Sequence, residues 1–299
     1  MSYEEFNISI SARLQGFYGK DAVITTEKVL KNNGQSYYGL RIARKVTEST
    51  IPVIYMDRLY EAYGNGSMTM EECVREVCRI RKKYECTEDI LQFADKLSDW
   101  EFVKENVYPV LLSTEENREL LQKLVSTPLL DLSVVYMIRE DKEKCVKISK
   151  AMMDSYGIDK IKLHRQAVEN MKKDGYKFQD MEELIMEIYH GEDFGEDILP
   201  FDENRRGKMY VLTNRENLYG AAGILDKTMI REFAGNRNFF ILPSSLHEII
   251  FVPDDDGLKG KEFDEMVAEI NETVVRKEDK LSDHSYYYDA KEDEIRICN

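Results

Sequence analysis

The stretch that decides the fold is residues 210–253, YVLTNRENLYGAAGILDKTMIREFAGNRNFFILPSSLHEIIFVP. Its apolar runs are short, rich in aromatic and β-branched residues, and bounded by turn residues, which is typical of strands. The segment between them has helical spacing of its apolar residues. We expect two short strands, a helix and two more strands, the third strand leading into the polar cluster 243–248.

A succession of strand, strand and helix recurs elsewhere in the chain, near residues 21–64 and 132–174 as well as 210–234. In the first of these, Asn32-Asn33-Gly34 lies between two β-rich runs, and Asn-Gly in that position predicts a hairpin. Amphipathic helices are predicted over residues 3–18, 69–84, 161–171 and 263–274. The fold class is therefore α+β, with mixed sheets covered by amphipathic helices.

The middle of the chain, residues 87–149, is predicted to contain a helical region followed by a hairpin. Residues 87–125 are predicted to be mainly helical, residues 129–139 to form one strand, and residues 145–149 to be its hairpin partner. The Gly-, Pro- and acid-rich segment 191–204 is typical of a linker or exposed loop. We therefore expect an N-terminal α+β part, residues 1–190, with a helical middle, and a C-terminal α/β part, residues 205–299.

The net charge of −15 is concentrated in two places. Residues 182–203 contain nine acidic residues and no Lys or Arg, and residues 254–299 contain fifteen acidic residues against seven basic ones. A protein that binds nucleic acid through its phosphates needs a basic surface, so this composition predicts no direct binding to nucleic acid. An acidic surface could instead bind a basic partner protein, mimic nucleic acid, or serve only as a solvated surface that keeps the protein soluble.

The sequence predicts a cytoplasmic protein with no membrane contact. No apolar run approaches the roughly 18–20 residues that span a bilayer, and the N-terminus lacks the basic start and apolar core of a signal peptide. The five cysteines are odd in number and include no Cys-x-x-Cys pair, so we expect reduced thiols rather than disulfides or a zinc site.

The polar cluster PSSLHE, residues 243–248, offers two hydroxyls, an imidazole and a carboxylate. These groups could serve nucleophilic or acid-base chemistry, and the candidate site residues are Ser244, Ser245, His247 and Glu248. Three interpretations stay open: a structural turn, a binding site, or a hydrolase-type site. In the last, a serine would be the nucleophile, His247 the base, and Glu248 or Asp283 the orienting carboxylate.

Specific catalytic and cofactor motifs are absent from the sequence. The cluster has no Gly-x-Ser-x-Gly elbow, and Phe251 stands where a zinc protease helix has its second histidine. A calcium loop around Gly257 would need a carboxylate at position 263, which is Phe263. The four histidines are scattered and no nucleotide-binding motif is present. No metal and no cofactor is predicted.

Several segments together resemble a known family. They are KNNGQSYYGLRI (31–42), IPVIYMDRLYEAYGNG (51–66), LLDLSVVYMI (129–138), YVLTNRENLYGAAGIL (210–225) and FILPSSLHEIIFVP (240–253). They are similar to the bacterial domain of unknown function family 5688, which occurs often on mobile elements of anaerobic Firmicutes. The resemblance implies that PSSLHE, Leu-Thr-Asn and Tyr-Gly-Ala are parts of a family pattern, and it implies no activity.

The functional hypothesis from sequence is a non-catalytic intracellular interaction or accessory protein, for which the family resemblance suggests a mobile element as the setting. One alternative is a hydrolase-type enzyme that uses the PSSLHE loop. Another is an acidic nucleic-acid mimic that blocks a nucleic-acid-binding protein.

Overall fold

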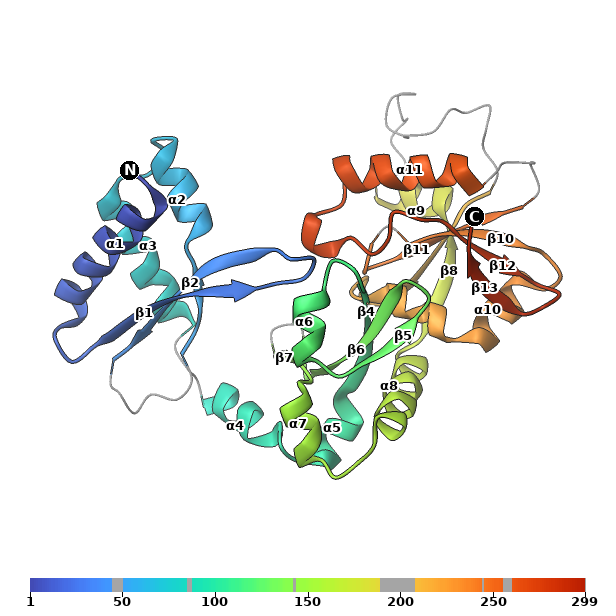
Figure 1. Cartoon of the computed structure of the whole chain (residues 1–299), viewed down its shortest axis with the longest axis horizontal. Helices are drawn as coiled ribbons and strands as arrows, with labels where there is room; N and C mark the ends of the chain where they lie inside the picture. Colours follow the sequence, from blue (N-terminus) through green and yellow to red (C-terminus); the bar gives the residue numbers. More distant parts are fainter. Residues whose placement is uncertain are drawn as a thin grey trace. The chain divides into compact units, whose positions relative to one another are not determined.

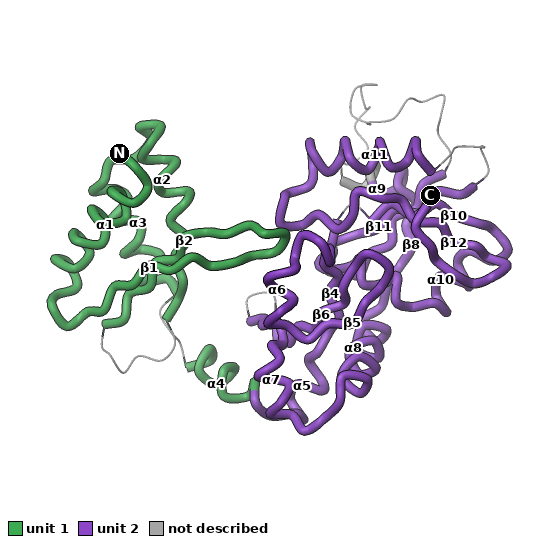
Figure 2. Tube along the Cα trace, in the orientation of Figure 1, with its two compact units in different colours: residues 1–97 green, residues 98–299 purple. Residues whose placement is uncertain are grey.

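The computed structural model describes residues 1–44, 51–84, 88–141, 144–188, 208–243, 245–254 and 260–298. The chain divides into two compact units, unit 1 (Met1–Leu97) and unit 2 (Ser98–Asn299), coloured separately in Figure 2. The boundary expected from the sequence is residues 191–204, which lie outside the described residues. The strands on either side of that segment are neighbours in one sheet of unit 2.

Unit 1 consists of one helix, a three-stranded antiparallel sheet and three further helices. Helix α1 (Tyr3–Tyr18) is followed by strands β1 (Val23–Leu30), β2 (Ser36–Ala43) and β3 (Ile54–Tyr55), paired in the order β1-β2-β3, and then by α2 (Asp57–Gly64), α3 (Met70–Lys83) and α4 (Glu88–Lys96). The predicted hairpin is confirmed: Asn33 and Gly34 both have positive φ, and the Lys31 N–H donates to Gln35 O at 2.7 Å. Such left-handed residues match the twist of the flanking strands.

Helices α1 and α3 of unit 1 begin with the same reciprocal cap. The Ser2 hydroxyl accepts from Glu5 N while the Glu5 carboxylate accepts from Ser2 N, and Thr69 and Glu72 repeat the arrangement. This satisfies N–H groups that a helix start leaves unpaired. The buried residues of α1, β2 and α3 then form one core: Phe6, Ile10, Leu14, Leu40, Ile42, Cys73 and Val77.

Unit 2 contains two antiparallel sheets. The first, of four strands, comprises β4 (Val107–Ser113), β5 (Ser126–Leu129), β6 (Leu132–Arg139) and β7 (Cys145–Lys147), in the order β4-β6-β5 with β7 paired to β6. Around it lie α5 (Trp100–Asn106), α6 (Arg118–Lys123), α7 (Lys150–Ser155) and α8 (Lys160–Asp174). Helix α8 is joined to β4 through Asn170, whose Nδ2 donates to Val107 O at 3.0 Å.

The second sheet of unit 2 has six strands in the order β13-β12-β10-β11-β9-β8. They are β8 (Tyr176–Asp180), β9 (Tyr210–Asn214), β10 (Phe239–Leu242), β11 (Ile249–Pro253), β12 (Tyr286–Asp289) and β13 (Glu294–Ile297). The helices of this half are α9 (Met181–Ile188), the 3-10 helix η2 (Gly220–Leu225), α10 (Lys227–Ala234), α11 (Gly260–Thr273) and the short 3-10 turn η3 (Lys277–Asp279).

Both faces of the six-stranded sheet are covered, which explains why the run Phe239-Phe240-Ile241-Leu242 is apolar at every position and fully buried. Phe240 and Leu242 contact α11 through Phe263 and Val267. Phe239, from the opposite face, packs against Phe233 of α10 at 5.3 Å between ring centroids. Figure 1 shows α11 and α10 on opposite sides of this sheet.

The two sheets of unit 2 are linked through Asp131, in the turn between β5 and β6. Its carboxylate accepts hydrogen bonds from the Tyr286 hydroxyl of β12 and from Ser282 Oγ, the latter at 2.8 Å. Tyr286 is fully buried, and burial is the main reason that its pKa lies well above the ordinary value, with the Asp131 carboxylate adding to the effect.

The α+β class predicted from sequence is correct, and three local predictions are wrong. Residues 107–113, placed in a helical region, form edge strand β4, where Pro109 is tolerated because an edge strand leaves some N–H groups unpaired. The strand predicted over 129–139 is interrupted by Leu130, whose φ of 54° turns the chain between β5 and β6. The second of the two short strands expected at the start of residues 210–253 is instead the 3-10 helix η2.

Among the described residues, none of the helices has the length and apolar character needed to cross a membrane.

Candidate functional site

The PSSLHE loop connects β10 to β11 at the middle of the six-stranded sheet. Ser244 lies outside the described residues, and its neighbours are held by main-chain bonds to residues 279–282. Pro243 O accepts from Ser282 N at 3.1 Å, and Leu246 N donates to Asp279 O at 2.9 Å. These bonds join the loop to the segment that precedes β12.

Ser245 takes part in the turn itself. Its Oγ accepts a hydrogen bond from the His247 main-chain N–H at 3.0 Å, and the residue is 3% exposed. Local bonds of this kind let a serine hydroxyl stand in for a main-chain acceptor. The described contacts of Ser245 therefore stabilise the loop.

His247 has a partner at each ring nitrogen. Its Nδ1 lies 3.3 Å from the main-chain N of Tyr219, from which it accepts, and its Nε2 lies 3.6 Å from Asp279 Oδ1. Because Nδ1 is the acceptor, the proton of the neutral ring is assigned to Nε2, toward the carboxylate. The geometry defines a histidine and carboxylate pair that faces a main-chain amide.

The carboxylate of this pair belongs to Asp279, which is not among the candidates expected from the sequence. The two candidate carboxylates lie elsewhere: Glu248 is half-buried and makes no hydrogen bond or ion pair with described residues, and Asp283 accepts from Asn271 Nδ2 at 2.6 Å. Asp279 stands 32 positions after His247 in an unremarkable Lys-Glu-Asp run. Nothing in its local pattern distinguishes it from its neighbours.

The segment 213–221 meets the PSSLHE loop directly. Thr213 Oγ1 donates to His247 O at 3.0 Å, and Ala221 N donates to Leu246 O at 3.3 Å. A Cβ atom at Gly220 would lie 2.4 Å from His247 O, so only glycine permits this approach. The Leu-Thr-Asn, Tyr-Gly-Ala and PSSLHE elements, separate in sequence, thus form one structural centre.

Tyr219 is the residue that connects this centre to the four-stranded sheet. It has a left-handed main chain, with φ of 58°, and its ring lies 5.7 Å from the His247 ring between centroids. The ring also packs on a cluster that includes Leu112 and Val135. Burial raises the pKa of the Tyr219 hydroxyl, and the nearby Cys145 and Asp279 act in the same direction.

The turn that follows β9, residues 214–216, also borders a charged pocket of about 260 Å³. We call it the Arg139 pocket; it is lined by Asn106, Tyr108, Arg139, Glu140, Asp141, Asp174, Asn214, Arg215 and Glu216. Arg139 is at its centre, with a side chain only 11% exposed, and pairs with Asp174 at 2.9 Å and with Glu216 at 3.1 Å. The Tyr108 ring covers the guanidinium at 4.6 Å.

The pKa of Asp174 is raised in this pocket. Burial raises the pKa of its carboxyl, while the charge of Arg139 acts in the opposite direction. A perturbed carboxyl in a polar cavity is a recognised mark of a functional site. The pocket is not predictable from local sequence pattern, because its residues come from four separate segments, 106–108, 139–141, 174 and 214–216.

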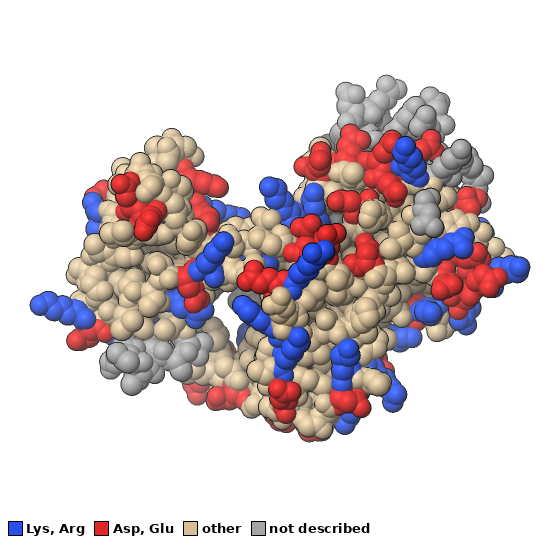
Figure 3. Space-filling model, viewed as in Figure 1, with Lys and Arg blue, Asp and Glu red and all other residues tan. Residues whose placement is uncertain are grey.

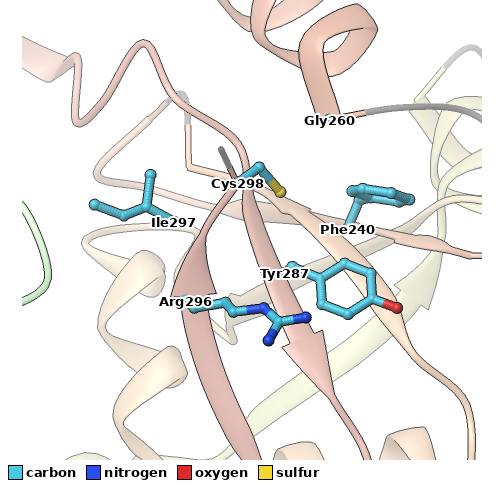
Figure 4. Close-up of a pocket in the computed structure, with 6 residues that line it drawn as sticks. All are labelled: Phe240, Gly260, Tyr287, Arg296, Ile297 and Cys298. Carbon is cyan, nitrogen blue, oxygen red and sulfur yellow. The ribbon is translucent and has the colours of Figure 1, made fainter.

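A second pocket, of about 340 Å³, lies between the start of α11 and strands β10, β12 and β13. Figure 4 shows its lining residues, with the Arg296 guanidinium beside the Tyr287 ring; the guanidinium carbon is 5.2 Å from the ring centroid. Burial raises the pKa of the Cys298 thiol, which makes it a poor nucleophile. The walls of this second pocket are mostly apolar, and no acid and base pair is found among its lining residues.

Among the described residues, no group of three or more His, Cys, Asp and Glu side chains is arranged to hold a metal ion.

Comparison with protein families gives a match over most of the chain. The profile of the family of unknown function DUF5688 matches residues 3–290. The protein belongs to this family. Comparisons with curated proteins and with solved structures give no match.

Proposed function

We propose that the protein is a non-catalytic interaction protein of the cytoplasm that binds the basic face of a partner protein through the acidic surface of unit 2. An accessory role for a mobile element is the setting that the family resemblance suggests. The observation that carries the proposal is the distribution of charge between the two units.

Unit 1 is electrically neutral and unit 2 holds the entire net charge. Residues 1–97 contain 14 basic and 14 acidic residues, and residues 98–299 contain 28 basic and 43 acidic residues, a difference of −15. A surplus that served solubility alone would need no such segregation. Concentrated on one folded unit, it attracts a basic partner and accelerates its association.

Within unit 2, helix α11 presents the most regular acidic surface. We define the α11 acidic stripe as Glu262, Glu265, Glu269 and Glu272, all exposed and spaced three or four positions apart. Like charges at this spacing destabilise a helix, so the stripe works against the stability of α11. Figure 3 shows acidic side chains gathered in the region where Figure 1 places α11.

The proposal is tested by paired capture from the native host. The full chain and the variant E262Q/E265Q/E269Q/E272Q serve as baits in parallel, and the matched control E4Q/E61Q/E88Q/D89N removes the same four charges from exposed positions of unit 1. We expect a basic protein that the wild type and the control retain and the stripe variant loses. Equal recovery by all three baits, or no specific protein on any, refutes the proposal.

The same experiment separates a general interaction protein from a nucleic-acid mimic. If the captured partner binds DNA or RNA, adding that nucleic acid in excess releases it from a mimic, because both occupy one surface. A partner that stays bound in the presence of nucleic acid uses another surface, and the decoy hypothesis is then rejected.

A further inference from the structure

The Arg139 pocket is built around a guanidinium that is fixed in position before any ligand arrives. Tyr108 covers its face, Asp174 holds one edge at 2.9 Å, and little of the side chain reaches solvent. An arginine held in this way loses little conformational freedom when it binds another group. Its remaining edge is directed to Glu216.

Glu216 contacts that edge of the guanidinium from an exposed turn. It belongs to the turn that follows β9, where Asn217 has a φ of 52°, and its side chain is 45% exposed. The turn is held by Asn214, whose Oδ1 accepts from the main-chain N of Glu216 at 3.2 Å. The side chain of Glu216 can therefore leave Arg139 without disturbing the turn.

Arg215, the neighbour of Glu216, adds a second guanidinium to the pocket. It makes no hydrogen bond or ion pair with the residues that the structure describes, and it lies along Gly175, where a Cβ atom would be 3.3 Å from its Nε. Two guanidiniums from different strand ends thus border one cavity, and one of them has its donors available.

The charge balance of the pocket accommodates an exchange of carboxylates. The positive charges are those of Arg139, Arg215 and Lys144. The negative charges are those of Asp174, Glu216, Glu140 and Asp141. Lys144 pairs with Glu140 at 2.6 Å and with Asp141 at 3.2 Å. This leaves one surplus negative charge. When Glu216 turns toward solvent, one carboxylate of a ligand can take its place beside Arg139 and lie near Arg215.

We infer that the Arg139 pocket binds a small molecule through a carboxylate, with Glu216 as the resident group that the ligand displaces. Guanidinium and carboxylate form two parallel charge-assisted hydrogen bonds, which fixes the orientation of the ligand. The volume of about 260 Å³ lies just below the range of typical small-molecule sites. It fits a compact acid of a few carbon atoms. The inference is independent of the acidic stripe on α11.

The test uses the full chain labelled with 15N, with succinate as probe and the arginine Nε–Hε signals as readout. We expect succinate to shift the signals of Arg139 and Arg215, and the neutral analogue succinamide to leave them in place. Removing the resident carboxylate with E216Q should tighten succinate binding about threefold, the effect of an exposed ion pair. R215Q should weaken it roughly tenfold, the effect of a lost charge-assisted bond.

The sign of the change in succinate affinity caused by E216Q distinguishes a carboxylate site from a cation site. E232Q removes the same charge from an exposed position of α10 and should leave succinate binding unchanged. A pocket for cations would bind 1,4-diaminobutane instead and would be weakened by E216Q. That result overturns the inference, as does binding of inorganic phosphate without succinate, or the absence of any shift in folded E216Q.

Discussion

His247 accepts a hydrogen bond from the main-chain N–H of Tyr219 through Nδ1, at 3.3 Å. A neutral imidazole has one unprotonated nitrogen, and a general base must direct that nitrogen at the proton it removes. In His247 this nitrogen is already engaged, and Nε2 faces Asp279. The contact thus uses the imidazole to connect the PSSLHE loop to the turn before η2.

Replacing His247 by alanine should therefore reduce stability. It leaves the Tyr219 N–H without its acceptor, which costs about 1–3 kcal/mol of unfolding free energy. H247N, whose side-chain oxygen can take the place of Nδ1, should recover part of the loss. Trp100 is the chain's one tryptophan and lies in unit 2, so its fluorescence during urea unfolding measures the effect. Equal stability of H247A and wild type would contradict a structural role.

Gly220 should be intolerant of any side chain. An alanine Cβ would lie 2.4 Å from both His247 O and Thr213 Oγ1, and forced overpacking costs roughly 1–3 kcal/mol. The control is G16A in α1, where nothing lies within 4 Å of the added atom; a helix gains about 0.5–1 kcal/mol from this change. We expect G220A to lower the Trp100 unfolding midpoint, whereas G16A should not lower it.

The pKa of Asp174 should lie above the ordinary value of an aspartate, because burial raises it. The folded state then binds the proton more readily than the unfolded chain. The free energy of unfolding therefore falls as the pH rises from the ordinary pKa to the raised one, and the cost persists at higher pH. R139Q removes the charge that opposes this shift, so the pKa should rise further. A 13C NMR titration of the carboxyl measures both values, and a lower pKa in R139Q would contradict the account.

The fold was predictable wherever local pattern and burial agree. The α1 helix, the hairpin at Asn33 and the final strands β12 and β13 all show their period in a few neighbouring residues. Strand β4 did not, because Val107–Ser113 is apolar at nearly every position and is buried on both sides. Such a run has no period that separates strand from helix.

The candidate site was predictable only in part, for a different reason. PSSLHE stands out as a polar cluster, yet the partners of His247 come from residues 28 positions before it and 32 after it. Arg139 and Glu216 are separated by 77 positions and meet because β6 and β9 end near each other. Pairing of distant segments is a property of the sheet topology, which one sequence does not display.

The α11 acidic stripe gives a prediction in which stability and binding change in opposite directions. In E269K the new lysine follows Glu265 by four positions and precedes Glu272 by three, so two repulsive pairs become attractive. Each such pair contributes about 0.2–0.5 kcal/mol to helix stability. A positive charge near the C-terminal end of a helix is also favourable. We expect E269K to raise the thermal unfolding temperature of the chain and to weaken capture of a basic partner. E269Q, which removes the repulsion without adding attraction, should lie between wild type and E269K in both measurements. If partner capture instead follows the unfolding temperature, rising in E269K, the stripe acts through the stability of α11 and its charge is not the contact.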